Sequence, residues 1–309
     1  IQALEYGAFD FVTKPENYLE TKSVEFKNRI FEMLNVATSS RSSIRRTSMR
    51  STVRSTEAFS NRRTTDSSKT TFTGLRRSVD RSTETTARAT RPVFTSEPQE
   101  KAVKVDGSKY TRVKAGKNKL VALACSTGGP KSLQQVIPML PGNLDAGVVL
   151  VQHMPAGFTA SLAARLNEMS AINVKEAADG DVIKKGWVYI APGGKHIRVK
   201  KKGSDCVIAL SDEAPIEGLR PCANIMYESL AECNYDEITC VVLTGMGADG
   251  TNGIKALSRS RKNLYVISQD EETCVVYGMP KAIANTGLVN EVVPLNRVAE
   301  AITKNVGVS

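Results

Sequence analysis

Three residues whose side chains could perform nucleophilic catalysis stand at or shortly after the ends of three apolar runs in this 309-residue sequence: Ser126, His153 and Asp249. A histidine can take the proton of a serine hydroxyl as general base, and a carboxylate can orient the imidazole and stabilise its positive charge. Because such a triad is recognised by geometry and not by chain order, the order Ser, His, Asp is no objection. The first hypothesis is therefore a serine esterase. The sequence around the serine is not Gly-x-Ser-x-Gly, so an ordinary α/β-hydrolase is not expected.

Ser126 lies where an apolar run changes into an amphipathic pattern, a change that predicts a strand, a tight turn and a helix. Pro130 falls at the first helical position, where its missing N–H costs nothing. Gly128 and Gly129 allow the backbone to turn sharply before it. The hydroxyl of Ser126 is therefore expected at the tip of a strand, beside a helix N-terminus that favours a nucleophile and an oxyanion.

Other interpretations of this stretch stay open. A serine before a helix is more often a cap or turn residue, and this motif alone favours that interpretation. A Walker phosphate loop does not fit, because it would need glycines at Cys125 and Pro130. Cys125 is the competing nucleophile, but strand alternation predicts that its side chain points away from that of Ser126.

His153 follows the apolar run 147–151 and is the best candidate for the general base. A lone histidine is more often a structural hydrogen-bonding residue. Ligands of open α/β sheets, however, bind at the carboxyl ends of the strands, so a serine and a histidine there in consecutive units favour catalysis. The other histidine, His196, follows a Pro-Gly-Gly sequence near a predicted hairpin, and we interpret it as a surface residue or a substrate contact.

Asp249 belongs to a Gly-x-Gly-x-x-Gly pattern at residues 245–250, and Asp270 ends the next predicted strand. This pattern is the dinucleotide fingerprint, so a nicotinamide-dependent oxidoreductase is the second hypothesis. Asp249 argues against it, because a carboxylate in that loop would repel a pyrophosphate. As a catalytic residue, the same carboxylate could accept a hydrogen bond from His153 Nδ1 and fix the tautomer of the ring.

The elements that must position these side chains appear from Lys117 onward, where apolar runs alternate with amphipathic stretches. The runs predict strands at 120–124, 147–151, 187–190, 196–199, 206–210, 239–243 and 264–268. The amphipathic stretches predict helices at 130–140, 156–167, 222–233, 250–257, 280–285 and 296–305. This alternation indicates an α/β fold with a doubly wound, mostly parallel sheet and helices on both faces. A basic turn at 200–205 predicts a β-hairpin insert.

Composition sets residues 36–116 apart, because they are dominated by Ser, Thr and Arg. Thirteen basic and five acidic residues between positions 36 and 98 supply 8 of the 10 net positive charges of the chain. Such a segment cannot offset its ordering entropy, so we expect a disordered linker. An arm for RNA or anionic lipid is the alternative, and a binding module without chemistry is the third functional hypothesis. The arm is disfavoured because regular aromatic interleaving is lacking, so no nucleic-acid partner is expected.

The six cysteines are scattered without Cys-x-x-Cys spacing, and there are only two histidines, which suggests neither a zinc site nor a disulfide framework. No apolar run approaches the length that spans a bilayer, so membrane insertion is not expected. We therefore predict a cytoplasmic protein with free thiols, no bound metal and no cofactor.

Five stretches together resemble the family of chemotaxis protein-glutamate methylesterases, CheB: residues 126–130, 152–159, 189–196, 243–250 and 274–280. The resemblance implies that Ser126, His153 and Asp249 form the triad. It implies an oxyanion or substrate-binding site at Thr127, Met246 and Gly247. The implied activity is hydrolysis of γ-glutamyl methyl esters on methyl-accepting chemotaxis receptors, with release of methanol and often deamidation of glutamines. The implied protein is a monomer.

Residues 1–35 resemble the end of a response-regulator receiver domain, through Gly7-Ala-Phe-Asp10 and Thr13-Lys-Pro15. Lys14 matches the lysine that contacts the phosphorylated aspartate in receivers, and the phosphoacceptor would precede Ile1. The expected organisation is a receiver fragment at 1–35, a linker at 36–116 and the catalytic domain at 117–309. The intact receiver would be phosphorylated by the chemotaxis histidine kinase. The fragment alone is too short to bury a core, so we expect it to be poorly ordered.

Overall fold

The computed structural model describes residues 118–260 and 262–309, together with eleven residues near the start of the chain: Val12, Ser23, Val24, Phe26, Lys27, Ile30, Phe31, Met33, Leu34, Asn35 and Thr38. The described residues from Val24 to Thr38 have helical backbone, as expected for the last helix of the first segment. Lys14 and, apart from Thr38, the predicted linker lie outside the described residues. The proposed domain boundaries therefore stay predictions.

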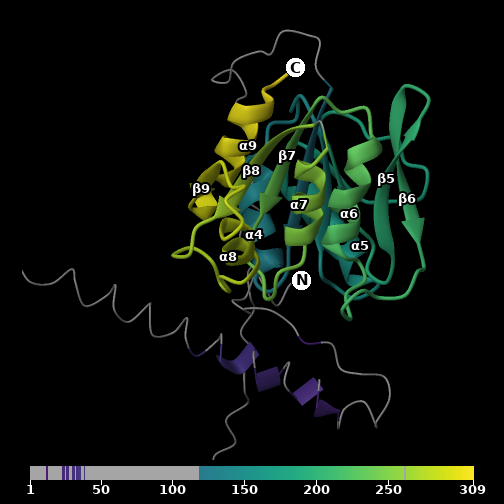
Figure 1. Cartoon of the computed structure of the whole chain (residues 1–309). Helices are drawn as coiled ribbons and strands as arrows, with labels where there is room; N and C mark the ends of the chain where they lie inside the picture. The colour runs from purple at the N-terminus through teal and green to yellow at the C-terminus, as the bar shows by residue number, and fades with distance from the viewer. Residues whose placement is uncertain are drawn as a thin grey trace, which may run out of the picture. The chain divides into compact units, whose positions relative to one another are not determined.

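Seven strands form one sheet in the order β3-β4-β2-β1-β7-β8-β9, and each adjacent pair is parallel (Figure 1). The strands are β1 (Lys119–Cys125), β2 (Gly147–Gln152), β3 (Asn173–Glu176), β4 (Trp187–Ile190), β7 (Glu237–Val242), β8 (Asn263–Gln269) and β9 (Glu291–Val293). Every residue of β1 and β2 is buried, as is typical of a parallel sheet that is covered on both faces.

Helices cover both faces of the sheet, and each face has its own apolar core. One core contains residues of α4 (Gly129–Val136), α5 (Phe158–Met169) and α9 (Val298–Val306). The other contains residues of α6 (Ala223–Ser229), α7 (Thr251–Ser258) and α8 (Met279–Ala284), and of the hairpin formed by β5 (His196–Lys202) and β6 (Asp205–Ser211). The doubly wound α/β fold and the antiparallel hairpin insert are therefore confirmed.

Two strands of the sheet were not predicted, β3 and β9. Both are short and lie at the edges, and their sequences mix apolar with charged residues, so neither contains a continuous apolar run. The first predicted helix also changes its form along its length, since α4 ends at Val136 and a 3-10 turn continues from Ile137 to Met139. Pro138 explains the change, because proline has no N–H for the α-helical bond.

The strand order has its switch point at β1. From β1 the chain passes through α4 to β2 on one side, whereas β7, on the other side of β1, connects through α7 to β8. Helices α4 and α7 lie on opposite faces. Ligands of such sheets bind at the carboxyl ends of the strands beside a switch point. The loops that follow β2, β1 and β7 are therefore expected to form the site.

Asn118, directly before β1, lies at the opposite rim, where the strands begin. Its backbone N–H donates to Asp236 Oδ2 (2.8 Å), directly before β7. Among the described residues, no helix combines the length and the apolar character needed to cross a membrane.

Candidate active site

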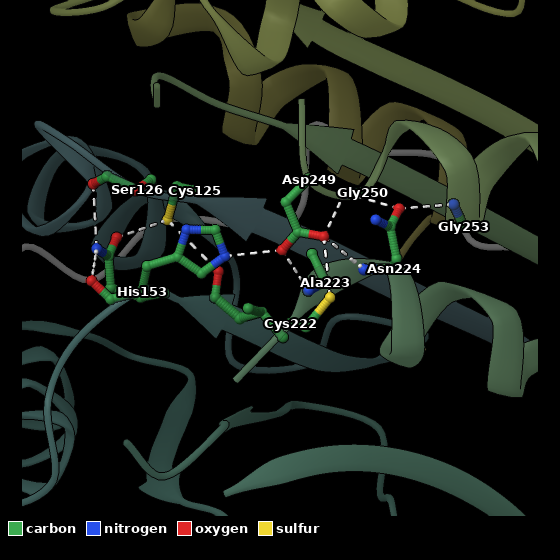
Figure 2. A network of polar contacts seen from close by, with 11 residues as sticks. Cys125, Ser126, His153, Cys222, Ala223, Asn224, Asp249, Gly250 and Gly253 are labelled. Atoms are coloured by element: carbon green, nitrogen blue, oxygen red, sulfur yellow. Dashed lines mark hydrogen bonds and ion pairs between the residues drawn. The ribbon is translucent and has the colours of Figure 1, made fainter. Parts of the chain in front are cut away.

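The structure places Ser126, His153 and Asp249 at the carboxyl ends of three adjacent strands, β1, β2 and β7 (Figure 2). Strands β1 and β2 pair as far as Cys125 and Gln152, and the backbone N–H of His153 then donates to the carbonyl of Cys125 (3.3 Å). His153 Nε2 lies 2.8 Å from Asp249 Oδ2. The predicted contact between imidazole and carboxylate is therefore present.

The predicted ring nitrogen is wrong. We expected Nδ1 of His153 to contact Asp249, but Nε2 makes the contact. Nε2 is the ring nitrogen that faces Asp249, and Figure 2 shows this contact as a dashed line. The strand order gives the reason. Because β1 lies between β2 and β7, the side chain of His153 has to extend across β1, and Nε2 is the ring nitrogen farther from its backbone. Because a carboxylate only accepts, Nε2 carries the proton in this contact and Nδ1 is left as an acceptor.

The carboxylate of Asp249 is buried, and several groups donate hydrogen bonds to it. Besides His153, the donors are the backbone N–H groups of Ala223 (2.6 Å), Asn224 (3.0 Å) and Gly250 (2.8 Å) and the thiol of Cys222 (3.2 Å). Burial raises the pKa of Asp249, but the hydrogen bond and charge of His153 and the N–H groups of Ala223 and Asn224 outweigh it and lower the pKa to about 2. Asp249 is therefore ionised at neutral pH.

The thiol of Cys222 acts as a hydrogen-bond donor to Asp249. Burial and, after it, the negative charge of Asp249 together raise the pKa of Cys222 to about 12. A thiol with so high a pKa stays protonated, so it is no competing nucleophile at neutral pH.

Asn224 caps the N-terminus of α7. Its Oδ1 accepts from the backbone N–H groups of Gly250 (3.0 Å) and Gly253 (2.7 Å), the glycine residues at the start of this helix. In a dinucleotide site, such N–H groups bind the pyrophosphate. Here these N–H groups already donate to Asn224 and Asp249. The Gly-x-Gly-x-x-Gly loop therefore holds the carboxylate of Asp249 in place and does not offer its N–H groups to a nicotinamide cofactor.

Ser126 is half-buried, and its backbone is fixed on both sides. Its N–H donates to the carbonyl of Thr244 (3.0 Å), and its carbonyl accepts from the N–H of Gly129 (2.7 Å). A Cβ atom on Gly245 would lie 2.9 Å from Ser126 Cβ, so glycine permits the close approach of the loop that follows β7. Within residues 118–260 and 262–309, however, the Ser126 hydroxyl makes no hydrogen bond to His153.

Cys125 is fully buried in the core that contains α4. Its thiol donates to Gln152 Oε1 at 3.0 Å. This placement agrees with the strand alternation that pointed Cys125 away from Ser126.

The three residues expected at the oxyanion or substrate site, Thr127, Met246 and Gly247, lie in the loops that follow β1 and β7. Among the described residues, their backbone N–H groups donate to no protein acceptor. The hydroxyl of Thr244 links the two loops by donating to the carbonyl of Thr127 (3.0 Å). N–H groups without a protein acceptor, on two loops joined by a hydrogen bond, are suited to stabilising a developing oxyanion.

Four supporting residues were missed: Gln152, Cys222, Asn224 and Thr244. Gln152 and Thr244 are polar residues next to the ends of buried strands, a position that could have identified them. Cys222 and Asn224 bind Asp249 from 25 to 27 residues earlier in the chain, and no sequence pattern indicates that contact.

The interpretation of His196 as a surface residue or substrate contact is wrong. The side chain is fully buried, and its Nε2 lies 3.1 Å from the carbonyl oxygen of Ala214. His196 therefore joins the hairpin to the following loop. In the part of the chain that is described, no group of three or more His, Cys, Asp or Glu residues could hold a metal ion.

Comparisons with known proteins identify the family of the chain. A family model described as CheB methylesterase matches residues 121–302. The protein-glutamate methylesterase/protein-glutamine glutaminase of Desulfotalea psychrophila is 36% identical over 309 residues, which cover 99% of this chain and 73% of that protein. The protein of the same name from Pyrococcus abyssi is 37% identical over 306 residues, covering 99% of this chain and 69% of that one.

A solved structure is also similar, the crystal structure of the Thermotoga maritima CheB methylesterase catalytic domain. It matches with a TM-score of 0.59 and 41% sequence identity, covering 62% of this chain and all of that domain. The predicted fold class and the predicted class of enzyme, a hydrolase of carboxylic esters, are confirmed. The chain belongs to the CheB methylesterase family.

Proposed function

We propose that this chain is a protein-glutamate methylesterase, with protein-glutamine glutaminase activity, in which Ser126 is the nucleophile, His153 the general base and Asp249 the residue that orients the base. One observation carries the proposal. The 2.8 Å contact between His153 Nε2 and the ionised Asp249 lies at the edge of the sheet where β1 delivers Ser126. This contact leaves Nδ1 of the ring as the proton acceptor.

The acylation step begins with transfer of the Ser126 proton to His153 Nδ1. A rotation of the serine side chain brings Oγ to the ring, since catalytic hydrogen bonds often form only when substrate is bound. Oγ attacks the γ-carbonyl carbon of a glutamyl methyl ester. The N–H groups of Thr127 and Met246 stabilise the resulting oxyanion. Asp249 remains ionised and stabilises the imidazolium.

The intermediate then collapses. Methoxide leaves with the proton that His153 returns, so methanol is released and a glutamyl acyl-enzyme forms at Ser126. Water attacks this ester while His153 takes a proton from the water. His153 then returns the proton to Ser126 Oγ as the acyl bond breaks, so that glutamate is released and free serine is regenerated. A glutamine side chain would follow the same steps with ammonia as the leaving group.

The substrates of the proposed enzyme are side chains of methyl-accepting chemotaxis receptors, and the reaction serves chemotactic adaptation. The names of the relatives support glutamate methyl esters and glutamines of proteins as the groups acted on. We propose a monomer that acts in the cytoplasm. The free cysteines among the described residues are typical of a reducing compartment. The proposed regulator is the chemotaxis histidine kinase, which would act through a complete receiver that ends with residues 1–35.

The test is methanol release from methylated receptor, combined with labelling by a serine-directed phosphonate. We expect wild-type protein to release methanol and to carry the phosphonate on Ser126, and S126A to do neither. Labelling of Ser126 without methanol release would indicate a serine hydrolase with another substrate. Methanol release by S126A would overturn the proposed nucleophile.

A further inference from the structure

Gln152, the last residue of β2, places a buried carboxamide between the two strands that carry Ser126 and His153. Its Nε2 donates to the carbonyl oxygen of Ser126 (3.1 Å) and to that of His153 (3.2 Å). We propose that Gln152 is a positioning residue that sets the nucleophile, the base and the oxyanion donor relative to one another. The inference rests on the proposed function, because it assigns a role within the same triad.

The chemistry of the neighbours determines the orientation of the carboxamide. Both carbonyl oxygens can only accept, so the NH₂ group must face them. Oε1 is then left for the thiol of Cys125, which lies 3.0 Å away. A glutamate of the same shape would place a carboxylate against two carbonyl oxygens and would lose both donors.

Gln152 acts at the point where the backbone ladder ends. Strands β1 and β2 pair as far as Cys125 and Gln152, and one more bond joins His153 N–H to the carbonyl of Cys125. Beyond that bond, the carboxamide connects the segments that follow the two strands. Among the described residues, this one side chain therefore hydrogen-bonds to the backbone of both Ser126 and His153 and adds to the backbone bonds that hold each of them.

The peptide plane gives Gln152 influence over the oxyanion site. The carbonyl of Ser126 and the N–H of Thr127 belong to the same planar trans peptide unit, so fixing the carbonyl also fixes the direction of the N–H. The Thr127 N–H is one of the proposed oxyanion donors. Loss of the bond to the Ser126 carbonyl would therefore misdirect that donor, although Gln152 itself touches no substrate.

The start of α4 is built around this carboxamide. A Cβ atom on Gly129 would lie 1.9 Å from Gln152 Oε1, a clash that only glycine avoids. The N–H of Gly129 donates to the same Ser126 carbonyl that Gln152 binds. Glycine at 129 therefore permits both bonds to the Ser126 carbonyl at once.

The experiment compares Q152E and Q152M with wild type, with Q135E as the matched control on the exposed face of α4. Methanol release from methylated receptor gives kcat and KM, and thermal unfolding reports folding. We expect kcat of both Gln152 variants to fall by roughly 10²-fold, as for loss of one oxyanion donor, with KM within about twofold of wild type. Q135E should retain wild-type kcat.

The pH profile separates positioning from a structural role. When the introduced carboxyl of Q152E is protonated, one O–H donor returns. The ratio of Q152E to wild-type kcat should therefore rise as the pH is lowered from about 8 to about 6, whereas the ratio for Q152M should stay constant. If Q152E does not fold, the kcat and KM of the uncharged Q152M decide the question.

The outcomes distinguish the two proposals. Wild-type kcat in Q152M or in folded Q152E, with S126A inactive, would overturn only the role of Gln152. A reduced kcat in Q152E with a flat pH ratio would also overturn it. An inactive wild type, or an active S126A, would instead overturn the proposed function.

Discussion

The two ends of the candidate triad are held in opposite ways. The carboxylate of Asp249 accepts hydrogen bonds from His153, Cys222 and three backbone N–H groups, and it is buried. Ser126 is half-buried and, in the part of the chain that the structure describes, its hydroxyl has no hydrogen bond to the proposed base. Its position is determined by its backbone, through Thr244, Gly129 and Gln152.

This difference fits the proposed role of each group. A buried charge is costly unless it is paired and hydrogen-bonded, so Asp249 needs many donors. A nucleophile has to move from its resting position to the substrate, so a strong permanent partner for its hydroxyl would oppose the reaction. A carboxylate with many donors, and a hydroxyl without a hydrogen bond to the base on a fixed backbone, satisfy both needs.

Replacing the hydroxyl of Ser126 should have the largest effect. We expect S126A to lower methanol release by about 10⁶-fold, because loss of the nucleophile removes the acyl-enzyme route. C125A is the control, since its buried thiol is bound to Gln152, and it should keep most of the activity. Activity in S126A together with its loss in C125A would assign the nucleophile to Cys125.

Replacing the fixed carboxylate should have the second largest effect. We expect D249N to reduce kcat by roughly 10⁴-fold, because an amide can donate to Nε2 and would stabilise the tautomer with the proton on Nδ1. Methanol release under saturating receptor measures this loss. Turnover equal to that of wild type would remove Asp249 from the mechanism and leave only its structural role.

The charge of Asp249 should also contribute to stability. Its pKa falls from 3.8 to about 2 on folding, so the contribution, about 2 kcal/mol, is complete above about pH 4 and is lost as the pH falls toward 2. Urea unfolding at pH 5 and at pH 3 measures the loss. The asparagine of D249N does not titrate, so this variant should lose less stability over that interval. An equal loss in both proteins would assign the acid sensitivity to other carboxyl groups.

Removing the side-chain cap of α7 should have the smallest effect. We expect N224A to destabilise the fold by about 1 kcal/mol, because the N–H groups of Gly250 and Gly253 lose their cap. N252A, an exposed asparagine on the same helix, is the control and should change the unfolding temperature little. Equal unfolding temperatures of N224A and wild type would show that the cap contributes nothing measurable.

The sequence could predict which residues reach the site, because each follows an apolar run and parallel strands end at the same edge. It could not predict which nitrogen of His153 faces Asp249, because that depends on β1 lying between β2 and β7. The burial of His196 depends on the path of the loop that contains Ala214, which no local pattern encodes. Cys222 and Asn224 contact Asp249 from a distant segment of the chain. Both residue types are also common in ordinary loops.

The place of Asn118 at the starting rim of the sheet has a consequence for control of the enzyme. Strand β1 has seven residues, so the chain that arrives at Asn118 is separated from the catalytic edge by about 20 Å. A segment upstream of Asn118 that covers this edge has to span that distance along β1. An extended connection that spans this distance to the candidate site needs about six residues.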